Sequence, residues 1–474
     1  MTELHYLSAT DVLRAFRSRE LSPIEVFDAV VARSDAVEPT VNALLERDVD
    51  DGRAAAAAAA ERYAGTGTPP RPLEGLPIVL KEVQPIAGRS LRLGSLVTEG
   101  LVADETHPVV ERSLAAGALV HARTTTPEFS CAAFTHSELW GITRNPWNPD
   151  FSPGGSSGGS GAALASGMAY LASGSDIGGS IRIPASFCGV VGFKPPYGRV
   201  PELPPYNLDS YCHEGPMGRT VADVALFQNV ISGRHPVDHT SLPAVPIPAD
   251  LGDVRGMHVA LAITLGDFPI DPEVEANTRD FGRALRAAGA VVEEVAVHVS
   301  RVEVISAALT HYGSLMGPSM TELCEPDDAR LMAYTREFLA LSDAELARVG
   351  LFGGQVLEAR VQRALAEVFE DHDALICPTV GATGFVAGDD YTGHGITVAG
   401  LEVEMYIFAA LTPVFNIASR HPVLNVPSGR ASNGIPTGVQ VVARTYDDVT
   451  TFQVGAAAER ELGLWSDPTW RPNL

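Results

Sequence analysis

The sequence predicts an α/β fold in which helices cover a largely buried sheet. Two observations support this class. Stretches with a helical spacing of apolar residues alternate along the chain with short apolar runs typical of buried strands. Apolar residues also make up 45% of the 474 residues, which is enough to build a large core. Alternation of helices and strands indicates a sheet with helices packed on it.

The N-terminal part is predicted to be helical. Ser22 precedes Pro23 and stands three residues before Glu25, a pattern typical of a helix start with a capping box. The apolar residues at 26, 27, 30 and 31 then supply one buried face. A run of alanines at 54–60 is of low complexity, but alanine is the best helix former, so a helix is expected there too.

The elements that follow are expected in alternation. Apolar runs predict strands at 76–80, 118–122, 190–193, 257–263, 291–297, 374–378 and 436–443. Periodic patterns predict helices at 109–116, 162–166, 221–231, 272–288 and 451–462, and residues 302–370 are mostly helical. Residues 381–400 hold six glycines, which indicates a mobile loop near a site.

Charge and cysteine content narrow the classes of protein. The formal net charge is 34 − 58 = −24, so a nucleic-acid partner is not expected. No apolar run reaches the roughly 18 residues of a membrane span, and the first ten residues lack the pattern of a secretion signal. Five cysteines without a Cys-x-x-Cys pair indicate reduced thiols. We therefore expect a cytoplasmic protein without membrane association.

The most informative stretch is 152–182. It contains two Gly/Ser-rich loops, at 152–161 and 174–182, joined by an apolar segment that a flexible linker would not have. Glycines beside a serine allow close approach of a substrate. Such a serine can act as a nucleophile, with backbone N–H groups nearby to stabilise an oxyanion. The residues alone do not distinguish Ser156 from Ser157 or Ser160 as the working serine of the first loop.

Other catalytic motifs are excluded. The glycine-rich loops lack a P-loop ending and a dinucleotide-binding pattern, there is no His-Glu-x-x-His, and the 13 histidines show no metal-ligand spacing. We therefore expect neither a cofactor nor a metal. Residues 155–159 formally match Gly-x-Ser-x-Gly, but three prolines at 145–153 exclude the strand that a nucleophile elbow requires.

Three segments, in this order, resemble the amidase signature family: 75–81 (GLPIVLK), 154–161 (GGSSGGSG) and 176–182 (DIGGSIR). Further similar pieces lie at 143–147, 192–195, 215–223 and 434–440. The resemblance implies one domain over residues 1–474, with a mixed, mainly parallel β-sheet core covered by helices on both faces. Its family-like core would span about 60–245 and 372–474, with a helical N-terminus at 1–64 and a variable middle region at about 246–371.

The resemblance also implies a Ser–cis-Ser–Lys triad. On the matching positions the nucleophile is Ser180, the bridging serine is Ser156 and the base is Lys81, and the gap of 180 − 156 = 24 residues fits the family pattern. The bridging serine would follow a cis peptide bond from Gly155. A serine hydroxyl needs a base to become nucleophilic, and lysine can be that base where burial disfavours its ammonium form.

The same resemblance assigns the groups around the triad. An oxyanion hole would be formed by the backbone N–H groups of Ile177, Gly178, Gly179 and Ser180. A helix is expected directly after Ser180, with Pro184 in its first turn. Supporting roles fall to Gly155, Ser157, Asp176 and Arg182, the last two through structural hydrogen bonds. An apolar substrate pocket is expected to involve Phe134, Tyr206 and Tyr211.

The chain departs from the most common sequence pattern of the family at two positions. Glu82 follows the predicted base where aspartate is frequent, and Ser175 stands where threonine is frequent. Both changes are mild and leave the triad in place.

The predicted activity is hydrolysis of small apolar or aryl amides through a serine acyl-enzyme, with esters or carbamates also within reach. Residues 213–216 and 412–417 look closest to the branch of cyclic nylon-oligomer and urethane hydrolases. The only expected partner is a small-molecule amide substrate, and a homodimer is left open.

Two alternatives remain. One is a glutamine-amidotransferase A-type subunit that works in a complex, although its usual Asp-Glu-Phe-Ala is replaced by Thr-Pro-Glu-Phe-Ser at 126–130. The other is a non-catalytic anion-binding module, which leaves Lys81 and the paired serine loops unexplained.

Overall fold

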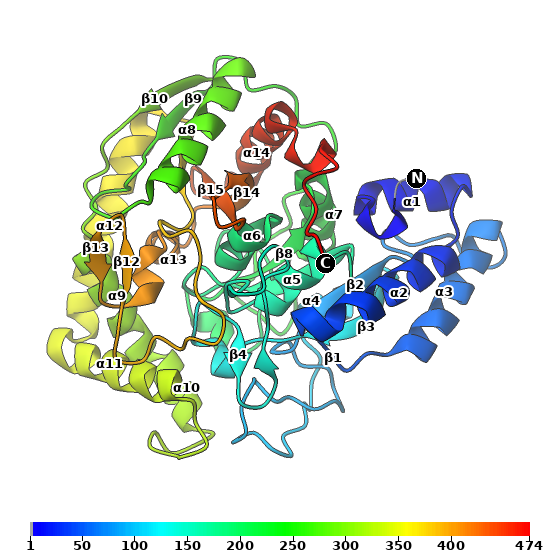
Figure 1. Ribbon diagram of the computed structural model, residues 1–474, viewed down its shortest axis with the longest axis horizontal. Coiled ribbons are helices and arrows are strands. Elements are labelled where there is room, and N and C mark those ends of the chain that lie inside the picture. The colour runs from blue at the N-terminus through cyan, green and yellow to red at the C-terminus, as the bar shows by residue number, and fades with distance from the viewer. Residues whose placement is uncertain (1–2) are drawn as a thin grey trace.

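The computed structural model describes residues 3–474, and an 11-stranded sheet runs through its centre (Figure 1). In spatial order the strands are β1 (Leu44–Leu45), β3 (Leu119–Thr124), β2 (Pro77–Lys81), β6 (Leu171–Ser175), β8 (Glu214–Gly218), β7 (Val191–Lys194), β14 (Val423–Arg430), β15 (Pro436–Ala443), β11 (Ala374–Pro378), β9 (His258–Leu261) and β10 (Val291–Glu294). Two small hairpins pair β4 (His136–Ser137) with β5 (Gly141–Ile142) and β12 (Ile396–Val398) with β13 (Leu401–Val403).

The sheet is mixed, as predicted, but its pairing is less parallel than expected. Parallel pairs lie toward its two sides, where β2 lies between β3 and β6, and β9 lies between β10 and β11. The central strands β6, β8, β7, β14, β15 and β11 pair antiparallel to one another. The sequence signal for parallel strands comes from helices between strands, and the helix at Arg182–Cys188 does join the parallel-running strands β6 and β7. The two are not neighbours, however, because β8 lies between them and pairs antiparallel with both.

The helices are α1 (Ala9–Ser18), α2 (Pro23–Val41), α3 (Val49–Ala64), α4 (Pro108–Ala115), α5 (Gly158–Ala165), α6 (Arg182–Cys188), α7 (Val221–Ile231), α8 (Pro272–Ala287), α9 (Arg301–Ser314), α10 (Met316–Thr321), α11 (Ala333–Val349), α12 (Leu351–Asp371), α13 (Val414–Ile417) and α14 (Asp448–Leu462). Figure 1 shows α1–α3 in blue on one side of the molecule and α9–α12 in yellow-green on the other. None of the helices within residues 3–474 combines the length and the hydropathy of a bilayer-spanning segment.

Helices cover both faces of the sheet, which confirms the predicted α/β class. Phe193 of β7 packs on Phe452 of α14, with ring centroids 4.7 Å apart. Its neighbour Gly192 lies against Ala185 of α6, because a Cβ there would come within 2.8 Å of the Ala185 methyl. Successive residues of a strand point to opposite faces, so α14 and α6 lie on opposite sides of the sheet.

Most predicted elements are present, including the capping box at Ser22 and the helix at 221–231. Strands β6, β8 and β14 were not predicted. β6 and β8 are rich in Gly, Ser and Pro, which local propensity disfavours in strands. Tertiary packing explains the small residues, because a Cβ at Gly215 of β8 would lie 2.2 Å from the carbonyl oxygen of Phe193.

The topology brings several chain ends to one edge of the sheet. Strands β2, β3 and β6 run parallel, so their last residues, Lys81, Thr124 and Ser175, lie at the same edge. Strand β8 is antiparallel to β6, so its first residue, Glu214, reaches that edge as well. In open α/β sheets, ligands bind in the crevice outside the carboxyl ends of parallel strands.

Candidate active site

Lys81 is fully buried at the carboxyl end of β2. Its Nζ lies 2.6 Å from Ser156 Oγ and 2.8 Å from Ser175 Oγ, and it donates to both hydroxyls. The backbone N–H of Lys81 donates to Ser173 Oγ at 3.0 Å, which fixes the strand end against β6. The amine is therefore held among hydroxyl groups rather than against a carboxylate.

Burial gives Lys81 the acid–base behaviour that a general base requires. Desolvation lowers its pKa from the usual 10.5 to about 8, while the neighbouring acidic groups of Glu214, Cys212 and Asp176 oppose this shift. A lysine with this pKa is partly neutral near physiological pH, so its lone pair can take a proton from a neighbouring hydroxyl.

The loop before α5 presents Ser156 to the lysine. The peptide bond between Gly155 and Ser156 is cis, as the resemblance implied. The next residue, Ser157, donates its backbone N–H to the carbonyl oxygen of Ser180 at 3.1 Å. This bond ties the two Gly/Ser-rich loops together, so Ser156 lies between the Lys81 amine and the segment that carries Ser180.

Hydrogen bonding separates the serines that the sequence left equivalent. Ser160 Oγ donates to the carbonyl oxygen of Ser173 at 2.8 Å, and Ser157 Oγ donates to that of Ser175 at 3.3 Å. Both are completely buried. Ser180 instead is 8% exposed and lines a cavity. Its hydroxyl has no hydrogen-bond partner within residues 3–474, and catalytic hydrogen bonds commonly tighten only in the substrate complex.

The loop at 177–180 offers unpaired backbone donors next to Ser180. Within the described part of the chain, the N–H groups of Ile177, Gly178 and Ser180 donate to no protein acceptor. The N–H of Gly179 differs from the expectation, because it donates to Asp176 Oδ1 at 2.9 Å. This N–H is therefore hydrogen-bonded within the loop, and the other three of the four predicted oxyanion donors bond to no acceptor among the described residues.

A buried ion pair braces this loop. Arg182 donates from Nη2 and Nε to the two oxygens of Asp176 at 2.8 and 3.0 Å, and both side chains are fully buried. The Arg182 guanidinium holds the pKa of Asp176 well below its usual range despite burial. Arg182 also donates to Gln440 Oε1 at 2.7 Å and to Asn416 Oδ1 at 2.7 Å. These contacts agree with the structural role expected for both residues.

The cavity beside Ser180 is apolar, but its walls differ from those predicted. Its lining residues are Ser130, Cys131, Ala132, Ala133, Ile177, Gly178, Ser180, Ile183, Tyr312, Met316, Phe338 and Ile407. Of these, none carries a charge. Tyr312 was not predicted; its hydroxyl donates to the carbonyl oxygen of Ile177 at 3.2 Å.

The three predicted pocket residues do not line this cavity. Phe134 is fully buried and stacks on His136 at 4.5 Å between ring centroids. Tyr211 stacks on His311 and donates to Glu358, so it forms a layer behind Tyr312. Tyr206 shares a hydrogen bond with Ser319. Aromatic residues near a motif in sequence are often core residues, and these three pack against other side chains outside the cavity lining.

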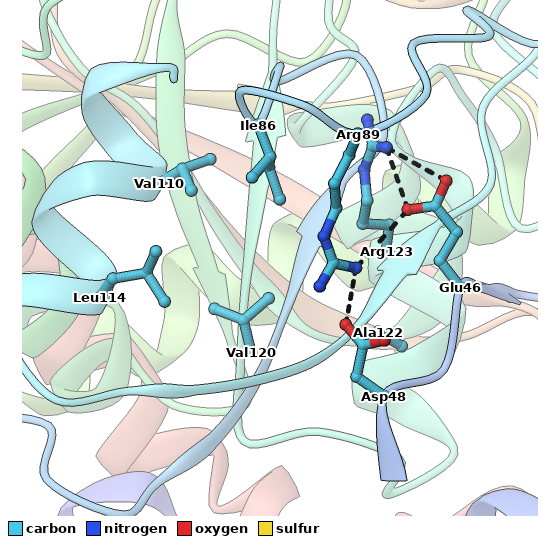
Figure 2. Close-up of a pocket in the computed structure, with 9 residues that line it drawn as sticks. All are labelled: Glu46, Asp48, Ile86, Arg89, Val110, Leu114, Val120, Ala122 and Arg123. Carbon is cyan, nitrogen blue, oxygen red and sulfur yellow. Dashed lines mark hydrogen bonds and ion pairs between the residues drawn. The ribbon is translucent and has the colours of Figure 1, made fainter. Parts of the chain in front are cut away.

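A second pocket is lined by residues of β3 and of neighbouring segments, and contains none of the predicted site residues. Figure 2 shows an apolar wall formed by Ile86, Val110, Leu114 and Val120, facing Arg89 and Arg123. Arg89 pairs with Asp48 at 2.6 Å, and Arg123 pairs with Glu46 at 3.2 Å. Its arginines are already neutralised by carboxylates, so this pocket offers no chemistry comparable to that at Lys81.

Sequence reasoning noticed Ser175 and Glu82 only as departures from the family wording. Ser175 supplies the second hydroxyl that contacts the lysine amine, a role that threonine would also fill. Glu82 accepts the backbone N–H groups of Arg92 and Leu93 at 2.6 and 3.0 Å and so fixes the chain that follows β2. The sequence shows that these positions carry a hydroxyl and a carboxylate, but it does not show which groups they contact.

Comparison with known proteins agrees with this geometry. The model of the family described as Amidase matches residues 25–452. The chain belongs to the amidase signature family. It is 33% identical to the A-type component of the glutamyl-tRNA(Gln) amidotransferase of Chloroflexus aurantiacus, over the full length of both chains.

Among solved structures, this amidase signature chain is similar to a bacterial aryl acylamidase and to 6-aminohexanoate cyclic dimer hydrolase. The acylamidase has a TM-score of 0.90 and 28% identity, covering 99% of this chain and 100% of the other. The cyclic dimer hydrolase has a TM-score of 0.84 and 28% identity, covering 99% of each chain.

The close approach of the backbone at Gly155 leads to a prediction. A Cβ at this position would lie 2.2 Å from the carbonyl oxygen of Phe134, so Gly155→Ala must displace backbone. We expect it to lower the free energy of unfolding by about 1–3 kcal/mol. Urea denaturation followed by circular dichroism measures the change.

Gly282→Ala in α8 is the matched control, because a Cβ there meets its nearest neighbour at an ordinary 3.4 Å. It should be neutral or stabilising by up to about 1 kcal/mol, since alanine favours helix. Equal urea midpoints for Gly155→Ala and the unmodified protein would contradict the proposed close approach.

Proposed function

We propose that this protein hydrolyses the C–N bond of small apolar or aryl amides through an acyl-enzyme on Ser180. The observation that carries the proposal is the buried Lys81 amine, 2.6 Å from Ser156 Oγ, in a loop that is hydrogen-bonded to the segment bearing Ser180, which lines an uncharged cavity. A desolvated amine next to a hydroxyl is suited to accept a proton, and a serine in an apolar cavity is suited to attack a carbonyl carbon.

The proposed reaction has two halves. In the first, neutral Lys81 takes a proton from Ser156, which takes one from Ser180, and Ser180 Oγ bonds to the substrate carbonyl carbon. The C–N bond then breaks as the proton returns through Ser156 to the leaving amine. In the second, water attacks the acyl-enzyme with the same proton relay, and release of the carboxylic acid restores the Ser180 hydroxyl.

The free N–H groups of Ile177, Gly178 and Ser180 are proposed to stabilise the oxyanion of each tetrahedral intermediate. Preorganised backbone donors of this kind are worth about 3–4 kcal/mol each when removed from a comparable site. The Asp176–Arg182 pair would act indirectly, by holding the loop so that these donors need no reorganisation during the reaction.

The cavity supports an apolar acyl group over glutamine. Glutamine carries an ammonium and a carboxylate, and burying either without a charged or strongly polar partner is costly. The cavity at Ser180 is lined by uncharged residues. The similarity to an amidotransferase component keeps glutaminase activity within a larger complex as the second candidate.

A substrate panel discriminates the two candidates. With the purified chain alone, we expect turnover of an aryl amide such as a p-nitroanilide with a short apolar acyl group, and little ammonia release from L-glutamine. Matched ester and carbamate substrates define the range of leaving groups. Ammonia release from glutamine without aryl-amide turnover would favour the amidotransferase candidate instead.

The nucleophile and the base can be tested separately. A serine-reactive phosphonate probe should label Ser180, and peptide mapping by mass spectrometry identifies the modified residue. Lys81→Ala should lower kcat by roughly 10²–10⁴-fold at unchanged fold, because the proton acceptor is lost. Labelling at Ser157 or Ser160, or an unaffected kcat in Lys81→Ala, would contradict the respective assignment.

The pKa of Lys81 sets the expected pH dependence. The base works only when neutral, so kcat/KM should rise with pH through a midpoint at about 8 and level off above it. The chain contains only two lysines, Lys81 and Lys194. NMR with ¹³C-labelled lysine ε-carbons therefore gives two resonances, which Lys81→Arg assigns. A Lys81 resonance that titrates near 10.5 would contradict the proposed base.

A further inference from the structure

A second group of ionisable side chains lies beside the lysine and has no role in the reaction above. His107, Glu202 and Glu214 place a ring nitrogen and two carboxyl oxygens within 4.8 Å of one another. His107 and Glu214 are buried, and Glu202 is nearly so. It is the one such His/Cys/Asp/Glu group found in residues 3–474.

The register of the sheet connects this group to Lys81. Glu214 stands directly opposite Ser175 in the antiparallel pair of β6 and β8, so the two side chains share one face of the sheet. Ser175 Oγ accepts from Lys81 Nζ. Gln84 also connects Glu214 to the end of β2. Its Nε2 donates to Glu214, and its Oε1 accepts from Ser173 Oγ, the same atom that accepts the backbone N–H of Lys81.

Hydrogen bonds locate the protons of the group. The backbone N–H of Val109 donates to His107 Nδ1 at 3.1 Å, so this nitrogen carries no hydrogen and Nε2 carries it. His107 Nε2–H then donates to Glu202 Oε1 at 2.8 Å, and the N–H of Leu203 donates to the same oxygen at 2.7 Å. Glu202 Oε1 therefore accepts from both groups.

The same tautomer argues against a metal centre. A metal ion would need the lone pair of His107 Nε2, which here carries hydrogen. Moving that hydrogen to Nδ1 would break the bond from Val109 at the start of α4. The contacts therefore describe a network of protons rather than a set of free ligands.

Glu214 is the partner that keeps its proton. Burial raises the pKa of Glu214 well above its usual range, the adjacent charge of Glu202 raises it further, and Gln84 and Lys81 oppose this. A carboxyl oxygen of Glu202 lies within 4.8 Å of one of Glu214. Two buried carboxyl groups this close resist double ionisation, so a proton stays on Glu214, the group whose pKa is raised.

We propose that Glu214 is a positioning residue that, by staying protonated beside Glu202, keeps the negative charge of the pair away from the Lys81 amine. The proposal rests on the role of Lys81 as the base. If Glu214 ionised, a carboxylate would stand beside Lys81 and favour its ammonium form, which cannot accept a proton.

The groups that face this pair are Lys81 on β2, His107 before α4 and Cys212 before β8, whose thiol lies 3.9 Å from Glu202 Oε2. Asp176, after β6, faces Lys81 but is neutralised by Arg182. A single substitution in the pair Glu202 and Glu214 can therefore change which of the two carries the negative charge.

Glu202→Gln provides the test, because it removes the charge that keeps Glu214 protonated and leaves an amide that can donate to an ionised Glu214. We expect the midpoint of the Lys81 ¹³C resonance, and the acidic limb of kcat/KM, to move upward by at least about one pH unit. At pH 7 the rate should fall about tenfold, and circular dichroism should show an unchanged fold.

The double variant Glu202→Gln/Glu214→Gln separates this charge effect from a structural one. With no carboxyl left beside Lys81, the midpoint and the limb should return to the wild-type position or lie below it. Glu214→Gln alone, whose amide mimics the protonated acid, should also leave the Lys81 midpoint and the acidic limb of kcat/KM at or below the wild-type position. An upward shift that persists in the double variant would overturn the proposal, as would an unshifted Glu202→Gln.

Metal analysis adds an independent criterion. A divalent ion held stoichiometrically by the purified protein and lost in Glu202→Gln would overturn the proton network. Failure of the proposed function would give a different result, because Lys81→Ala would then keep full activity. That result would show that Lys81 is not the base, and it does not depend on the carboxyl variants.

Discussion

The site depends on one constraint, the burial of the Lys81 amine among hydroxyl groups. A carboxylate in direct contact would satisfy the amine more strongly but would hold it as an ammonium ion. Ser156 and Ser175 instead provide hydrogen bonds at 2.6 and 2.8 Å without a charge. The sheet must bring the ends of β2 and β6 together for this, and the parallel pairing of these two strands does so.

Hydrogen bonds connect most of the polar side chains around the amine. The Asp176–Arg182 pair lies entirely out of contact with solvent, and a buried ion pair of this kind contributes little net stability. Its effect is geometric, because the same carboxylate also accepts from the N–H groups of Gly179 and Ile181. The loop keeps its shape while the N–H groups of Ile177, Gly178 and Ser180 point to no acceptor among residues 3–474.

Membership of the family does not by itself determine the substrate. The chain is similar over its full length both to a component of an amidotransferase and to an aryl acylamidase, so overall similarity does not select a substrate. The uncharged lining of the cavity at Ser180 is the observation behind our proposal of an apolar acyl group over glutamine. That lining includes side chains from α9, α10 and α11, such as Tyr312, Met316 and Phe338, from the region where the sequence resemblance is weakest.

The sequence by itself determined the α/β class and most helices, because periodicity is a local property, and its resemblance to the family predicted Lys81, Ser156 and Ser180 as the site residues. It did not determine the central antiparallel strands, because Gly-rich segments such as β8 become strands only when neighbouring backbone approaches them. Nor could it show that Gly179 is bonded to Asp176, that Phe134 and Tyr211 lie outside the cavity lining, or that Glu214 stands opposite Ser175. Those facts depend on contacts between residues far apart in the chain, and only the tertiary structure decides them.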